Sequence, residues 1–160
     1  MILLNFETAI KGDSSVASHT DWITIDSLQF GVGRAISASG GGADRETSNP
    51  SFSEVTLSKS MDKASVDLMM QAVCGKSLGK ATIHFVQTGG ADAKGQEYLE
   101  MVLHDAIVSS YSTSSGGERP SESFAINFNG FQMKYNKFTE GGTVTAGELK
   151  GWDMMKNEAL

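Results

Sequence analysis

The dipeptide His104-Asp105 offers the most chemistry in this sequence, because a histidine beside an aspartate supplies two members of a serine-hydrolase triad. The third member is a serine on a sharp turn between a strand and a helix, where its hydroxyl meets the substrate. We expect no serine of this chain at such a turn. The sequence therefore predicts that the protein is not an enzyme.

The three histidines, His19, His84 and His104, could instead bind a metal. A zinc site needs three or four nitrogen, sulfur or oxygen ligands, and two of them are usually close in sequence. These histidines are far apart, and Cys74 is the only cysteine. We expect no metal and no cofactor, a His84 with satisfied hydrogen bonds in a strand, and a Cys74 that is at least half-buried.

Two glycine-containing segments resemble phosphate-binding loops but do not match them. Gly31-x-Gly33 lacks the third glycine of a dinucleotide-binding motif, and no strand–helix unit follows it. Gly75-Lys76-Ser77 ends a predicted helix instead of opening one. A phosphate there would meet the negative end of the helix dipole, so we expect no nucleotide site.

The chain is long enough, at 160 residues, for one domain (1–160) with its own core. Its formal net charge is −6 and its basic residues are scattered, so we expect no nucleic-acid partner. The N-terminus has no basic region and too short an apolar run for a signal peptide or a membrane span. We expect a protein that folds in the cytoplasm and, if exported, leaves without a cleaved signal peptide.

Residues 62–74 form the only convincing helix. Its apolar residues follow the i, i+3, i+4, i+7 spacing of one helical face: Val66, Met69, Met70 and Val73. We expect this face to dock on the rest of the protein. Asp62 or Ser65 can cap the first turn, and Gly75 can end the helix with a left-handed backbone.

The remaining apolar residues alternate with polar ones and predict about seven strands, mostly antiparallel. The alternation changes phase at Asp26-Ser27, which predicts a bulge or a bend. Tyr98–Val108 is predicted to be one long central strand, and Asn129-Gly130 predicts a type I′ hairpin between the last two strands. The fold class is mainly β: a small antiparallel β-barrel of two sheets, or a two-sheet sandwich, flanked by one helix.

Three other features lie outside the regular strands. A Gly- and Ser-rich loop, about residues 37–51, is longer than a hairpin needs, and such loops are usually functional or disordered. Gln29, Gly31 and Gly33 form a small, polar strand face that should meet water or another backbone. Residues 139–160 form a polar C-terminal tail.

A series of different short motifs, in a characteristic order and spacing, extends along nearly the whole chain. They are Phe52, Thr56–Lys59, Asp62–Ser65, Leu68–Met70, Gly75-Lys76, Gly89-Gly90, Glu97–Leu99, Val108–Glu118, Glu122-Ser123, Asn127-Phe128, Gly151–Asp153 and Lys156-Asn157. Together they resemble the haemolysin-coregulated protein family, Hcp, the tube subunits of type VI secretion.

The resemblance implies a subunit that assembles into hexameric rings with a wide central channel. Rings would stack into an inner tube that a contractile sheath propels from the cell, with a spike protein at its tip and effector proteins in its lumen. It implies no catalytic residue. Gln29, Gly31 and Gly33 would line the lumen. The residues that would contact the neighbouring ring are Ser39, Gly40, Gly41, Gly42, Asp44, Arg45, Glu46 and Thr47.

Two alternatives remain open at this level. A phage-like tail tube protein would also form rings that stack into a tube. A monomeric small-ligand-binding β-barrel would differ, because its interior would be hollow and its native mass that of one chain.

Overall fold

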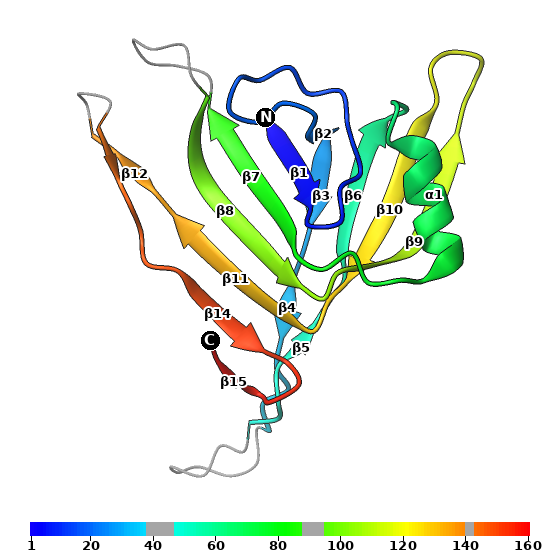
Figure 1. Ribbon diagram of the computed structural model, residues 1–160. Coiled ribbons are helices and arrows are strands. Elements are labelled where there is room, and N and C mark those ends of the chain that lie inside the picture. The colour runs from blue at the N-terminus through cyan, green and yellow to red at the C-terminus, as the bar shows by residue number, and fades with distance from the viewer. Residues whose placement is uncertain (38–46, 88–94, 140–142) are drawn as a thin grey trace.

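The structure is a computed structural model that describes residues 1–37, 47–87, 95–139 and 143–160. Two antiparallel sheets and one flanking helix dominate the described part (Figure 1). This confirms the predicted fold class, mainly β with two antiparallel sheets and a single helix beside them. Over the described residues the two sheets keep separate hydrogen-bond ladders, so the barrel is not closed.

The larger sheet has seven strands in the order β15-β14-β11-β8-β7-β1-β2. Their bounds are β1 Ile2–Phe6, β2 Ile23–Ile25, β7 Ala81–Gln87, β8 Gln96–His104, β11 Gly130–Tyr135, β14 Lys150–Asp153 and β15 Glu158–Ala159. The predicted tail, residues 139–160, thus contains two strands that extend this sheet beyond β11.

The smaller sheet has four strands in the order β3-β6-β10-β9. Their bounds are β3 Ser27–Gln29, β6 Val55–Ser60, β9 Ile107–Ser114 and β10 Ser121–Asn127. Two ribbons lie outside both sheets: β4 Val32–Gly33 with β5 Ser51–Phe52, and β12 Lys137–Phe138 with β13 Val144–Thr145. Buried apolar side chains from both sheets, such as Ile83 and Phe124, pack together into one core.

Short corners carry the chain from one sheet to the other. The predicted bend at Asp26-Ser27 is confirmed as such a corner, because β2 belongs to the larger sheet and β3 to the smaller. The predicted long strand Tyr98–Val108 is wrong, since it spans another corner, between β8 and β9. Asp105 there has a φ of 53°, a left-handed backbone that interrupts a strand. Its carboxylate accepts hydrogen bonds from Ser77 Oγ and Asn129 Nδ2.

The predicted hairpin at Asn129-Gly130 is also wrong. β10 pairs with β6 and β9, whereas β11 pairs with β8 and β14. A type I′ turn needs a positive φ at both central residues, and neither is among the described residues with a positive φ. The Asn129 N–H instead donates to the His104 carbonyl oxygen at 3.0 Å, and the chain crosses to the larger sheet.

α1, Ser65–Cys74, lies beside β9 (Figure 1). Gly75 ends it with the predicted left-handed backbone, at a φ of 62°. Ala64 occupies the N-cap position, and Asp62 Oδ1 accepts the Ala64 N–H at 2.9 Å. Among the described residues, no helix has the length and apolar content that crossing a membrane requires.

The predicted docking face of the helix is wrong. All four of its residues are exposed: Val66 (66%), Met69 (40%), Met70 (44%) and Val73 (73%). The helix buries Ser65 and Leu68 instead, and Ala64 and Ala72 also pack against the core. Ser65, Ala64 and Ala72 have small side chains, so Leu68 is the one large apolar side chain between the helix and the sheet. Cys74, predicted to be at least half-buried, is exposed at the end of the helix.

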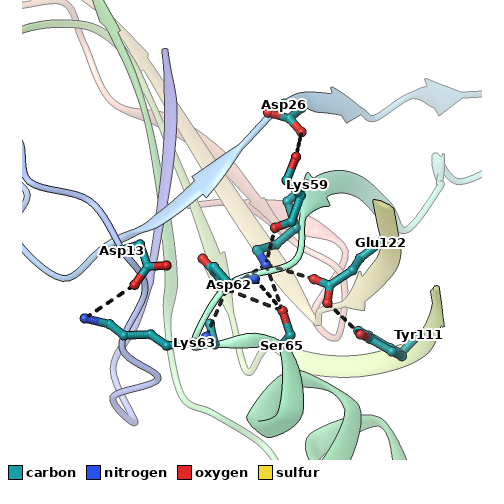
Figure 2. A network of polar contacts seen from close by, with 10 residues as sticks. Asp13, Asp26, Lys59, Asp62, Lys63, Ser65, Tyr111 and Glu122 are labelled. Atoms are coloured by element: carbon teal, nitrogen blue, oxygen red, sulfur yellow. Dashed lines mark hydrogen bonds and ion pairs between the residues drawn. The ribbon is translucent and has the colours of Figure 1, made fainter. Parts of the chain in front are cut away.

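A buried ammonium group joins the helix to the smaller sheet (Figure 2). The Lys59 side chain on β6 is fully buried, and its Nζ donates to Glu122 Oε2 at 2.8 Å and to Asp62 Oδ1 at 2.7 Å. It also donates to Ser65 Oγ at 3.3 Å. Glu122 on β10 in turn accepts the Tyr111 O–H from β9 at 2.7 Å. This lysine cluster therefore ties three strands to the first turn of α1.

The lysine cluster keeps Glu122 ionised. Burial opposes ionisation, but hydrogen bonds from Lys59, Ser65 and Tyr111 outweigh it and lower the pKa of Glu122. Because the lower pKa belongs to the folded state, the resulting stabilisation is present above the ordinary pKa of 4.5. It is lost as the pH falls through the pKa of the folded state.

We predict that Lys59→Met lowers the free energy of unfolding by about 3–5 kcal/mol, because Glu122 is left buried without its partner. Lys63→Met is the matched control, since the Lys63 side chain is 48% exposed and pairs with Asp13 and Asp21 at the surface. Its effect should be far smaller, because exposed pairs contribute little. Denaturant unfolding at a fixed chain concentration measures both variants, and equal losses would contradict the role of Lys59.

We predict that one of the three tyrosines ionises late in an alkaline titration followed by phenolate absorbance. Burial, the hydrogen bond to Glu122 and the charge of Glu122 raise the pKa of Tyr111 from 10.0 to about 12. The neutral phenol therefore stabilises the fold fully below pH 10.0 and progressively less as the pH approaches 12. Stopped-flow mixing records the ionisation before unfolding. Tyr111→Phe should remove the late step, and a late step that survives would rule out this assignment.

Candidate functional site

The strip of Gln29, Gly31 and Gly33 is exposed where β3 leads into β4. The Gly31 N–H donates to Ser53 Oγ at 2.9 Å, and the Gly31 carbonyl oxygen accepts the Ser53 N–H at 2.9 Å. Among the described residues, a Cβ added at Gly31 would meet only Ser53 Oγ, at 3.9 Å, and one added at Gly33 would meet nothing within 4 Å. Local packing therefore requires neither glycine, and the strip can face a large partner.

The predicted long loop, about residues 37–51, is reached along the β4–β5 ribbon, which projects from the lower edge of the sheets in Figure 1. A bridge between Ile36 and Thr47 and a hydrogen bond from the Ser48 N–H to the Ala35 carbonyl oxygen continue the pairing. Of the predicted ring-stacking residues, the structure describes only Thr47. The others lie outside the described residues: Ser39, Gly40, Gly41, Gly42, Asp44, Arg45 and Glu46.

The exposed apolar residues of α1 form a continuous stripe. This α1 stripe consists of Val66, Met69, Met70 and Val73, and their spacing places them on one side of the helix. A helix on the surface of a monomer normally turns such a stripe toward the core. Exposed apolar patches mark sites of interaction, so the α1 stripe has the character of a contact surface.

An apolar groove lies where the β4–β5 ribbon meets β11 and β14. It has a volume of about 410 Å³, and its walls include Val32, Phe52, Phe131 and Trp152. The Trp152 indole N–H is buried and has no hydrogen-bond acceptor in the part of the chain that the structure describes. Exposed apolar patches mark sites of interaction, so this groove is a second candidate contact surface.

Ser77, His104 and Asp105 do not form a catalytic triad. Gly75–Gly79 carries the Gly-x-Ser-x-Gly pattern of hydrolases, but the segment follows a helix instead of linking a strand to a helix. Ser77 Oγ donates to the Asp105 carboxylate, and His104 Nε2 lies 2.9 Å from Gln132 Oε1. His104 is therefore engaged elsewhere, and the serine and aspartate serve the corner between β8 and β9.

The structure brings His19 and His84 together, although they are far apart in the sequence. The expectation that no metal binds rested on that separation and stays a prediction. His19 lies in segment 7–22, between β1 and β2, and its Nε2 is 2.7 Å from Nδ1 of His84 on β7. Oε2 of Glu97 on β8 is 3.1 Å from the same Nδ1. These three residues, the histidine cluster, could hold a metal ion. Sequence spacing gives no signal for them, because each comes from a different element.

The interior of the protein does not resemble that of a hollow barrel. Buried apolar side chains from both sheets, among them Leu4, Leu57, Met101 and Ile126, belong to one packed cluster. The groove described above lies at the surface, beside the ribbon. This packing disfavours the alternative of a monomeric small-ligand-binding β-barrel.

Comparison with known sequences identifies relatives. A profile of the family described as "Type VI secretion system effector, Hcp" matches residues 3–135. Protein hcp1 of Pseudomonas aeruginosa is 34% identical over 107 residues, which cover 65% of this chain and 65% of that protein. The chain thus matches just under two thirds of the length of this relative.

Solved structures share the fold over nearly the full chain. A structure of a type six secretion system protein has a TM-score of 0.89 at 23% identity, covering 99% of this chain and 98% of that one. Hcp1 from Salmonella typhimurium has a TM-score of 0.76 at 21% identity, covering 99% and 97%. These likenesses show the fold, and the family profile extends over most of the sequence. This chain belongs to the Hcp family of type VI secretion system proteins.

Proposed function

We propose that this chain is a structural subunit of the inner tube of type VI secretion and has no enzymatic role. Six copies form a ring around a central channel, rings stack into a tube, and effector proteins travel in the lumen. A spike protein caps the tube, and a contractile sheath drives it from the cytoplasm to the outside. Membership of the Hcp family supports this proposal.

The α1 stripe carries the proposal of self-assembly. Its four apolar side chains are between 40% and 73% exposed in the single chain. Covering them with a second copy would stabilise the assembly by roughly 25 cal/mol for each Å² of apolar surface removed from water. This driving force is absent from a protein that acts as a monomer.

A ring requires head-to-tail contact between two different surfaces of each copy. In Figure 1, α1, which carries the stripe, lies at the right and β14, which contributes to the apolar groove, lies at the left. A head-to-tail contact needs two such separate surfaces. In the proposed ring, the stripe of one copy contacts the groove of the next.

The remaining surfaces suit the lumen and the stacking of rings. Gln29, Gly31 and Gly33 would line the channel, where small polar residues hold cargo without burying large apolar surfaces. The β4–β5 ribbon projects from the sheets and would carry loop residues such as Asp44, Arg45 and Glu46 to the neighbouring ring (Figure 1). Gly- and Ser-rich backbone there suits close contact with another chain.

A phage-like tail tube protein would use the same rings and the same stacking. Membership of the Hcp family favours secretion over a phage tail. The packed interior counts against the small-ligand-binding barrel.

We predict that the purified chain has a native mass six times its 17.0 kDa chain mass and forms annular particles in negative stain. Val73→Glu should shift the mass toward one chain, because it places a charge on the most exposed residue of the α1 stripe. Light scattering at several concentrations measures both proteins.

Gly33→Glu is the matched control, since it adds the same side chain at an exposed position where no atom of a described residue lies within 4 Å of the new Cβ. It should leave the rings intact. A wild-type monomer would overturn the ring. A Val73→Glu hexamer would place the α1 stripe outside the ring contact, and loss of rings in Gly33→Glu would remove the strip from the channel.

A further inference from the structure

The histidine cluster lies apart from the surfaces proposed for assembly. It joins segment 7–22 to the middle of the larger sheet, at strands β7 and β8. His19 is 4% exposed, while the side chains of His84 and Glu97 are 12% and 27% exposed. The site is therefore mostly shielded, yet open to solvent along Glu97.

The three potential ligand atoms already converge. His19 Nε2, His84 Nδ1 and a Glu97 carboxylate oxygen all lie within 4.8 Å of one another. A tetrahedral metal with bonds of about 2.0–2.1 Å holds its ligand atoms about 3.3 Å apart. The observed 2.7 Å between the two nitrogens and 3.1 Å between His84 and Glu97 are close to that spacing, and the His19 and Glu97 atoms must come within it from at most 4.8 Å.

The other ring nitrogen of each imidazole also has a hydrogen-bond partner. His84 Nε2 lies 3.2 Å from Glu100 Oε2, and His19 Nδ1 lies 2.7 Å from Ser18 Oγ. If each of these nitrogens carries its proton outward, both rings turn a lone pair toward the same point. Metal-binding histidines are oriented in this way, most typically by a carboxylate.

The charges around the cluster favour a cation. Glu97 and Glu100 lie on one side, and among the described residues Lys134 on β11 pairs with both, its Nζ 3.4 Å from Glu100 Oε1 and 3.8 Å from Glu97 Oε1. Burial lowers the pKa of His19, the His84 ring lowers it further, and Glu97 opposes both.

We propose that His19, His84 and Glu97 bind a divalent transition metal, with zinc as the best fit, and that the metal fastens segment 7–22 to the larger sheet. Two imidazole nitrogens and one carboxylate oxygen are a ligand set that zinc accepts and that calcium and magnesium do not favour. Water completes the fourth position. In the metal-free protein one of the two facing ring nitrogens donates a hydrogen bond to the other, and the metal would replace that hydrogen bond.

Trp22 provides a direct reporter of the site. Its ring centroid lies 4.6 Å from that of His19 and 4.8 Å from that of His84. The only other tryptophan, Trp152, lies in β14, outside this cluster. Co²⁺ bound at the histidine cluster should therefore quench Trp22, and Trp152→Phe removes the background emission.

The test is a titration of tag-free, chelator-treated protein with Co²⁺, followed by displacement with Zn²⁺. We expect one Co²⁺ per chain, the visible absorption of tetrahedral cobalt, and quenching of Trp22 that Zn²⁺ reverses. His19→Asn and Glu97→Gln should each weaken binding at least tenfold. Zn²⁺ should raise the melting temperature of the wild type but not of these variants.

Two control variants test whether the metal binds to residues outside the histidine cluster. His104→Asn removes the histidine that bonds Gln132 and should bind as the wild type does. Cys74→Ser removes the exposed thiol, the other soft ligand, and should also bind normally. Circular dichroism checks that each variant folds. The proposal is overturned if the wild type binds no Co²⁺, or if Cys74→Ser abolishes binding while His19→Asn and Glu97→Gln leave it unchanged.

Discussion

The buried ammonium group of Lys59 is the interaction on which the rest of this structure depends. An ammonium ion in an apolar core is strongly unfavourable unless it is paired and hydrogen-bonded. Asp62 and Glu122 supply the opposite charges, from the entry to α1 and from β10. They reach Lys59 together only when the helix is seated against the smaller sheet. Several residues through which the sequence resembles the Hcp family thus act in folding, and none of them needs a catalytic role.

The position of the helix against the smaller sheet also determines which of its side chains are exposed on the surface. The side toward the sheet is narrow, because Ser65 and Leu68 are its buried residues. The wider apolar stripe then faces outward, where a second copy could cover it. The same buried charge that stabilises one chain thereby presents the surface through which copies would assemble. Assembly would also protect the edge strands of the two open sheets, because neighbouring copies can cover their unpaired backbone groups.

Local signals predicted the elements well, whereas their partners depended on contacts distant in sequence. The alternation of apolar and polar residues located most strands. The corner at Asp105 was predicted to lie within one strand because the residues before and after it are equally apolar. The helix face was misassigned because apolar residues outnumber Leu68 on the outer side. Lys59 shares the inward parity of Val55 and Leu57 along β6, so the buried charge could have been found from the sequence. The histidine cluster could not, because three separate elements build it.

Hydrogen exchange followed by mass spectrometry in Glu122→Gln tests most directly whether the lysine cluster seats the helix. This change preserves the size of the side chain and removes the charge that faces Lys59. Peptides from α1 should take up deuterium faster than in the wild type, while peptides from β7 and β8 stay protected over the same period. Unchanged exchange in α1, or an equal increase in the helix and in the larger sheet, would contradict this role.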